Sequence, residues 1–194
     1  MNDRTIVSVC GPSGAGKSQL AKALTSSFGE DACARVPADY FIMPVVGPLD
    51  ESLNLPIVYD WATMYRTVAR PLGEVVSTPR FDFSTFKRSY DGDTRSFVVR
   101  PLLIIDAMYP YPCADFVVQL ELDASERRQR IIDRDGEWST RVLDRWEQLV
   151  ASEAQLRKSE VTPDLILSGG APIAENVRHV SRAVTAIRRR RQDQ

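Results

Sequence analysis

The sequence has few of the residues that mark secreted, membrane-bound or zinc-binding proteins. Its three cysteines, Cys10, Cys33 and Cys113, are an odd number and stand far apart, and the only histidine is His179. This pattern argues against a disulfide framework or a zinc site and predicts free thiols in a reducing, cytoplasmic setting. The sequence also lacks an apolar run of membrane-spanning length and the apolar core of a signal peptide. We therefore expect no membrane partner.

The sequence also has no large excess of positive or negative charge. Lys and Arg total 25, Asp and Glu total 26, and the formal net charge is −1. This balance argues against nucleic acid as a partner. Four arginines at 188–191 end the final predicted helix, where cations suit the helix dipole. A nucleic-acid contact is the alternative for this run, and a homo-oligomer is left open. The length of 194 residues suits one domain, 1–194.

What the sequence does have is a glycine-rich turn near its start, in VSVCGPSGAGKSQLAKAL. The β-branched and apolar run 5–10 predicts a buried strand, and Leu20, Ala23 and Leu24 have helical spacing after the turn. Between them, residues 11–18 match the pattern G-x-x-x-x-G-K-[ST], which requires this context of strand and helix. The sequence therefore predicts a phosphate-binding loop.

The residue types in this loop suit a nucleotide. Its glycines permit backbone angles that turn N–H groups inward around an anion, and the following helix adds its positive end. Lys17 can reach the β- and γ-phosphates, and the Ser18 hydroxyl can ligate Mg²⁺. ATP and Mg²⁺ are the predicted cofactors. The predicted nucleotide contacts are Gly11, Ser13, Gly14, Ala15, Gly16, Lys17, Ser18 and Gln19.

Two carboxylates follow apolar runs that predict neighbouring strands. Asp106 ends LLIID, where an acid in enzymes with this loop orients Mg²⁺. Asp39 follows the second predicted strand, at the sheet edge where ligands bind, and could accept a proton from a substrate hydroxyl. A capping or turn role is the alternative for each.

Arginines recur along the segment ASERRQRIIDRD. Arg127, Arg130 and Arg134 stand three and four residues apart and so share one helix face, and Arg141 lies seven residues beyond Arg134. These residues predict a lid, about 127–145, that brings guanidinium groups onto the phosphates and excludes water. The alternative is a solvated face paired with acidic neighbours.

Strands and helices alternate along the rest of the chain, which favours a parallel α/β sheet. We predict a helix from about Asp60 to Val76, irregular or hairpin-like structure over 77–100, and a helix over 138–158. A last amphipathic helix is predicted by apolar residues at alternating steps of four and three. These residues are Ile173, Val177, Val180, Val184 and Ile187.

Five pieces in one order, GPSGAGKS, DYF, YDWATMY, PRFDFSTFKR and ERRQRIIDRD, resemble the uridine kinase and phosphoribulokinase group of P-loop kinases. That group phosphorylates hydroxyls of small molecules. The resemblance runs from about Thr5 to Leu167. It implies an α/β, nucleoside kinase-like P-loop NTPase fold with a five-stranded parallel sheet flanked by helices, a lid and a substrate-binding insertion.

The resemblance also implies roles for single residues. Asp39 would be the catalytic base, acting with Lys17, Arg127 and Arg134, while Arg130 would contact the nucleotide and Ser18 and Asp106 the metal. Asp60 would hold hydroxyls of the acceptor. The predicted substrate-binding residues are Asp39, Tyr40, Asp60, Phe81, Phe86, Arg88 and Arg141.

Departures from the family pattern concern the acceptor. Asp106 stands where uridine kinases have Glu, Phe81 where they have Tyr, and Phe86 where they have the His that hydrogen-bonds the pyrimidine. Lost donors weaken discrimination for a polar base, so uridine and cytidine are expected to be poor acceptors. A different nucleoside or another alcohol is left open. The alternative functions are a nucleoside monophosphate kinase or a nucleic-acid-associated P-loop ATPase.

Overall fold

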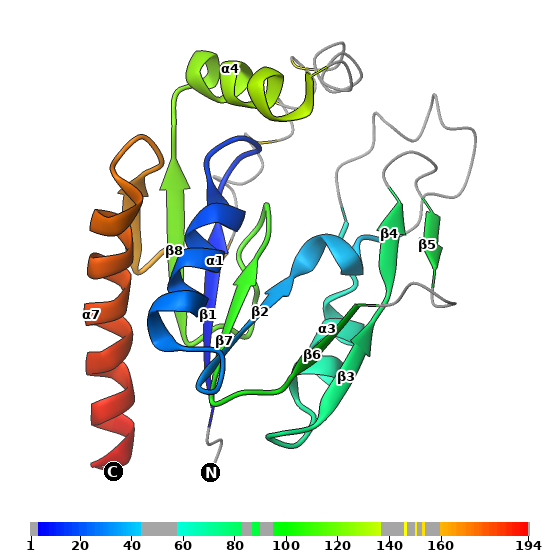
Figure 1. Ribbon diagram of the computed structural model, residues 1–194, viewed down its shortest axis with the longest axis vertical. Helices are drawn as coiled ribbons and strands as arrows, with labels where there is room; N and C mark the ends of the chain where they lie inside the picture. The colour runs from blue at the N-terminus through cyan, green and yellow to red at the C-terminus, as the bar shows by residue number, and fades with distance from the viewer. Residues whose placement is uncertain are drawn as a thin grey trace.

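The computed structural model describes residues 4–43, 58–82, 87–89, 95–136 and 160–193, together with Trp146, Val150 and Glu153. Figure 1 shows the arrangement of its helices and strands. The elements in chain order are β1 (Thr5–Cys10), α1 (Lys17–Phe28), β2 (Cys33–Pro37), the 3₁₀ turn η1 (Ala38–Phe41), α3 (Trp61–Val68), β3 (Val75–Thr78), β4 (Arg80–Asp82), β5 (Lys87–Ser89), β6 (Arg95–Val98), β7 (Leu102–Asp106), β8 (Phe116–Glu121), α4 (Ala124–Asp135), β9 (Leu165–Ser168) and α7 (Ile173–Gln192).

The central sheet has five parallel strands in the order β2-β7-β1-β8-β9, which confirms the predicted fold class. Its register aligns the ends of three strands. Asp106 on β7 pairs with Val9 on β1 and with Pro37 on β2. The ends of β1, β2 and β7 therefore meet at one edge, which is where the glycine-rich loop begins.

Each face of the sheet buries its own hydrophobic cluster. On one face, Leu20 and Leu24 of α1 and Val180 and Val184 of α7 pack against strand residues such as Val118. The opposite face packs against α3, which contributes Met64 and Val68 to the second cluster. In Figure 1, α1 and α7 lie side by side along the sheet, and α4 lies beyond the upper ends of the strands.

The last helix forms as its apolar spacing predicts, but the helix predicted over 60–76 is too long. α3 begins after Asp60, whose carboxylate accepts from the backbone N–H of Thr63 at 2.9 Å, and it ends at Val68. Pro71 has no N–H to continue a helix, and Gly73 has φ +84°. The chain therefore turns into β3.

The region predicted to be hairpin-like forms two antiparallel pairs in its described part, β3 with β6 and β4 with β5. Most of the helix predicted over 138–158 lies outside the described residues. The three that are described there, Trp146, Val150 and Glu153, have helical backbone.

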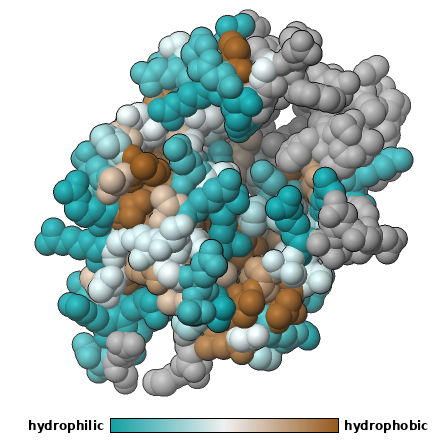
Figure 2. Space-filling view, in the orientation of Figure 1, coloured by the Kyte–Doolittle hydropathy of each residue, from teal (hydrophilic) through white to brown (hydrophobic). Residues whose placement is uncertain are grey.

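The surface of the described residues is mixed in character. Figure 2 shows hydrophilic side chains over much of one face, with smaller hydrophobic groups between them. Among the described helices, none has the length and apolar character needed to cross a membrane.

Candidate functional site

The glycine-rich loop joins the buried strand β1 to α1, as the sequence predicts. Gly11, Gly14 and Gly16 have φ values of +139°, +81° and +97°, which side chains with a Cβ avoid. Gly16 is the residue before the first turn of α1. The free N–H groups of that turn therefore open onto the loop, which is the arrangement that binds anions.

Two of these glycines and a third one far along the chain also allow backbone segments to pack tightly. A Cβ on Gly11 would lie 2.4 Å from the carbonyl oxygen of Leu120, and one on Gly14 would lie 2.8 Å from that of Arg127. Gly169, after β9, is equally crowded, because its Cβ would lie 2.3 Å from the carbonyl oxygen of Ala15. The loop is thus held between β8, α4 and the turn after β9.

Gly169→Ala should weaken ADP binding by about tenfold or more, because the new methyl group pushes on the loop backbone at Ala15. The matched control is Gly170→Ala, whose Cβ would meet side-chain atoms of Leu122 and Ser168 at an ordinary 3.4 Å. Calorimetric titration of ADP into both variants measures the effect. Equal affinities in the two variants would show that Gly169 does not support the loop.

Lys17 lies at the head of α1 among acidic side chains. Its Nζ donates to the carbonyl oxygen of Pro12 at 2.8 Å. Burial lowers the pKa of Lys17, while the nearby carboxylates of Asp39, Asp106 and Glu153 raise it. The structure thus brings the predicted phosphate-binding lysine together with both acids that the sequence singles out.

Asp106, at the end of β7, is buried, and both of its carboxylate oxygens accept hydrogen bonds. Its Oδ2 accepts from the hydroxyl of Ser18 at 2.7 Å. Arg35 on β2 binds both oxygens, with Nε 2.8 Å from Oδ1 and the terminal nitrogen 2.7 Å from Oδ2. Ser18 and Asp106, which the sequence predicts to hold the metal, thus contact each other. Arg35 is a residue that sequence reasoning missed.

Asp39 lies just beyond β2, in the turn η1. Burial raises the pKa of Asp39, and Asp106 acts in the same direction, while Lys17, Arg35 and a hydrogen bond from Tyr59 lower it. The Tyr59 hydroxyl in turn accepts from the backbone N–H of Met108 at 3.0 Å. An aspartate with a raised pKa, held in place beside a phosphate loop, has the properties of a general base.

The predicted substrate residues Asp60 and Arg88 contact each other. Arg88 donates to Asp60 at 3.0 Å and to the carbonyl oxygens of Phe41 at 2.8 Å and Ile42 at 3.2 Å. Asp60 also caps α3, and the hydrogen bonds from Thr63 and Arg88 lower its pKa despite some burial. The pair ties β5 to η1 and α3, and its role toward a substrate stays a prediction.

Aromatic side chains gather around Tyr59, the residue that hydrogen-bonds Asp39. Tyr59 stacks on Trp61 with ring centroids 4.6 Å apart, and Tyr109 and Tyr111 contact these two rings edge-on. Tyr40 packs against the same core cluster. These aromatic residues are visible in the sequence segments YDW and MYPYP. The two segments are far apart in the chain, so the sequence does not indicate that their rings contact each other.

Of the two phenylalanines predicted to line the acceptor site, Phe81 is buried in the core cluster with 5% of its surface exposed. Phe86 and Arg141 lie outside the described residues. The predicted contact of these two phenylalanines with the acceptor therefore stays a prediction.

The three arginines of α4 have different surroundings. Arg127 is buried and donates to both oxygens of Glu153, at 2.9 and 2.8 Å, and to the carbonyl oxygens of Ser13 and Leu122, each at 3.1 Å. Arg130 donates to Gly169 at 3.0 Å, and Arg134 is exposed in the last turn. Arg127 therefore lies against the glycine-rich loop, and Arg130 lies against the turn after β9.

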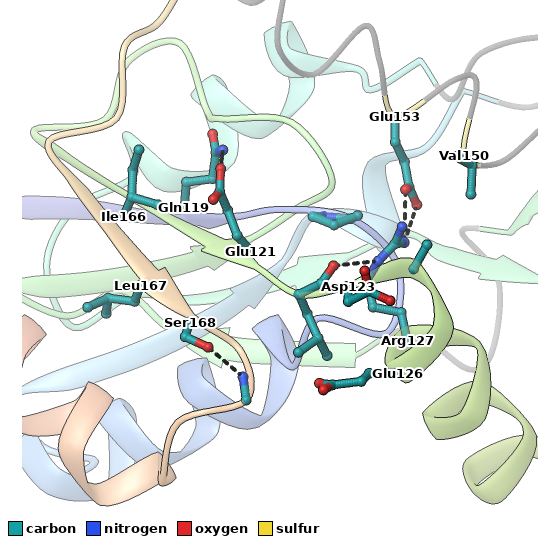
Figure 3. Close-up of a pocket in the computed structure, with 14 residues that line it drawn as sticks. Gln119, Glu121, Asp123, Glu126, Arg127, Val150, Glu153, Ile166, Leu167 and Ser168 are labelled. Carbon is teal, nitrogen blue, oxygen red and sulfur yellow. Dashed lines mark hydrogen bonds and ion pairs between the residues drawn. The ribbon is translucent and has the colours of Figure 1, made fainter.

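Glu153 is the acidic partner of Arg127 that the sequence did not suggest. Figure 3 shows the two side chains facing each other on one wall of a pocket of about 900 Å³ between α4, β8 and β9. Glu153 also accepts from the backbone N–H of Ser13, in the phosphate loop, at 3.2 Å. Its carboxylate thus occupies a loop donor that a phosphate oxygen would use.

Glu153→Gln should raise ADP affinity by about three- to tenfold, because it removes a negative charge from beside the phosphate loop. Calorimetric titration measures it, with the exposed Glu160→Gln as the control. Lower affinity in the first variant alone would instead mean that Glu153 supports the loop in its binding shape.

Comparison with known proteins bears on the fold. No family model and no curated protein matches the sequence. Solved structures do match: a candidate fructose transport system kinase from Silicibacter sp. TM1040 is 20% identical, with a TM-score of 0.59 over 84% of this chain and 89% of that chain. A gluconokinase from Sinorhizobium meliloti 1021 is 17% identical, with a TM-score of 0.56 over 99% and 97%.

A candidate uridine kinase from Bacillus stearothermophilus is also 17% identical, with a TM-score of 0.51 over 84% of this chain and 88% of that chain. At these identities, the likeness shows the fold alone. It confirms the α/β P-loop kinase fold that the sequence resemblance implied.

Proposed function

We propose that this protein is an ATP-dependent kinase that transfers the γ-phosphate to a hydroxyl group of a small molecule. One observation carries the proposal: the strand register that pairs Pro37 with Asp106 brings Asp39, just beyond Pro37, to the end of the glycine-rich loop, where Ser18 contacts Asp106. Lys17, which is partly buried, lies beside both acids. A hydroxyl acceptor must lose a proton, and Asp39 is placed to take it.

The donor set suits a magnesium ion. Mg²⁺ prefers hard oxygen ligands, and the Ser18 hydroxyl lies 2.7 Å from a carboxylate oxygen of Asp106. Ser18 would hold the ion, and Asp106 would orient it directly or through water. When bound with ATP, the ion supplies positive charge against the β- and γ-phosphates.

The remaining chemistry falls to the side chains of this chain. Lys17 stabilises the charge that develops on the transferring phosphoryl group, and Asp39 accepts the proton of the attacking hydroxyl. Arg130 and Arg134, on α4, lie on the element predicted to close over the phosphates, and closure excludes water that would otherwise hydrolyse ATP.

The acceptor is a small molecule in this proposal. The fold neighbours are described as kinases of different small molecules, which supports that class without selecting a member. Trp61 and Tyr109 contact Tyr59, which hydrogen-bonds Asp39, and their partly exposed rings favour an acceptor with an apolar face beside its hydroxyl group.

The proposal is tested by measuring ADP release from ATP and Mg²⁺ in the presence of nucleosides, sugars, vitamins and amino alcohols. We expect at least one acceptor to raise ADP release well above the rate without acceptor, and phosphorus NMR to identify a new phosphate ester. ATP hydrolysis that no acceptor accelerates would contradict a kinase and favour an ATPase.

A further inference from the structure

Arg35 lies in a position where a buried strand rarely carries a charge. Its neighbours Ala34 and Val36 pack into the core on one face of the sheet, and Cys33 packs beneath α1 on the other. Side chains alternate along a strand, so Arg35 shares the face of Cys33 and α1. In the parallel register, it pairs with Ile104, two residues before Asp106.

The guanidinium of Arg35 forms a bidentate pair with the carboxylate of Asp106. Nε lies 2.8 Å from Oδ1 and the terminal nitrogen 2.7 Å from Oδ2. The Asp106 side chain is only 3% exposed and that of Arg35 is 22% exposed. Planar, bidentate pairs of this kind are among the strongest charge-assisted hydrogen bonds, and burial makes an unpaired carboxylate costly.

The same carboxylate is the one that the proposed function assigns to the metal site. Oδ2 already accepts from Ser18 as well as from Arg35, so its two acceptor directions are taken. Oδ1 accepts from Arg35 and keeps one direction open. A divalent ion that approaches Ser18 and Asp106 therefore meets a carboxylate whose charge Arg35 already balances.

From this geometry, and on the basis of the proposed function, we infer that Arg35 is a positioning residue that tunes the metal site. It is the resident counter-cation of Asp106, fixes that carboxylate toward Ser18, and weakens the binding of a divalent ion. Because two cations compete for one carboxylate, the ion depends on the phosphates of the nucleotide for much of its affinity. The metal therefore enters with the nucleotide rather than before it.

The test uses Mn²⁺ as the probe, because carboxylate and water ligands suit Mn²⁺ and Mg²⁺ alike. Electron paramagnetic resonance of free Mn²⁺ gives its affinity for the full-length protein, with and without saturating ADP. Arg35→Met should bind Mn²⁺ about tenfold or more tightly than the unmodified protein in both conditions, since the competing charge is gone. Arg35→Lys keeps the positive charge but loses the bidentate geometry, so its Mn²⁺ affinity should lie between those of the unmodified protein and Arg35→Met.

Two matched variants make the result specific. Arg100→Met removes another arginine that pairs with an aspartate, Asp31 at 3.6 Å, away from the site, and should leave Mn²⁺ affinity unchanged. Adding Asp106→Asn to Arg35→Met should abolish the gain, because the freed carboxylate is what binds the ion. A gain that survives in the double variant would overturn the inference.

Unchanged or weaker Mn²⁺ binding in both Arg35 variants would also overturn the inference. If Arg35→Met fails to fold, the Mn²⁺ affinity of Arg35→Lys alone decides. Arg35→Lys that binds Mn²⁺ no more tightly than the unmodified protein would then contradict the inference. Thermal shift with ADP in chelator separates this result from the proposed function. A protein that ADP does not stabilise would contradict the kinase proposal. The order of Mn²⁺ affinities among the variants, measured without nucleotide, would still test the role of Arg35.

Discussion

Lys17→Ala is expected to lower kcat for phosphoryl transfer by about 10³-fold, while the protein stays folded. Lys17 donates to the carbonyl oxygen of Pro12. In the proposed function, it stabilises the negative charge that develops on the phosphates in the transition state. Its removal also leaves Asp39 with less positive charge beside it, because Lys17 is the cation that most lowers the pKa of Asp39. Steady-state kinetics with the acceptor found by screening measure the loss.

Lys22→Ala is the matched control, since Lys22 is exposed on the same helix. It should leave kcat within about twofold of the unmodified protein, as surface changes away from a site do. Circular dichroism and a thermal melt establish that both variants are folded. Turnover that survives in folded Lys17→Ala would refute the assignment of the loop to phosphates.

The glycine-rich loop between β1 and α1 could be predicted from the sequence because its determinants are local. Gly11, Gly14 and Gly16 have the positive φ values that the pattern requires, and the strand before them and the helix after them are fixed by nearby apolar residues. The last helix, α7, could also be predicted from its apolar spacing. Val180 and Val184, two of the residues that set its apolar spacing, are fully buried.

The contacts that complete the site are made between distant parts of the chain. Arg35 and Asp106 are 71 residues apart, and the register of two parallel strands brings them together. The sequence predicts that Arg127 belongs to a lid, and in the structure it is buried against Glu153, 26 residues later. Sequence spacing identifies which residues share a helix face, and it carries no information on which distant carboxylate will meet them.

Backbone packing at Gly169 also depends on a contact between distant parts of the chain. The pair of glycines after β9 predicts a turn, and only the folded structure shows that Gly169 lies against Ala15 while Gly170 has ordinary room. The predicted helix from Asp60 to Val76 is too long because the prediction gave no weight to Pro71 and Gly73, two local helix breakers that follow the observed end of α3 at Val68.

Asp39→Asn is expected to lower kcat by about 10²-fold or more, with ADP affinity changed little. Asparagine keeps the size of the side chain and its hydrogen bond with Tyr59, but it cannot accept the proton of the acceptor hydroxyl. Burial raises the pKa of Asp39, so the unmodified enzyme should lose activity on acidification at a higher pH than an ordinary aspartate would dictate.

The measurement that isolates Asp39 compares kcat from steady-state kinetics with ADP affinity from calorimetric titration, for the same preparation. Asp31→Asn is the control, because Asp31 is fully exposed and should change neither quantity. A general base acts on the acceptor and not on the nucleotide, so only kcat should fall. If instead ADP binding in the presence of Mg²⁺ collapses and kcat at saturation persists, Asp39 belongs to the metal site, and the proton of the acceptor leaves by another route.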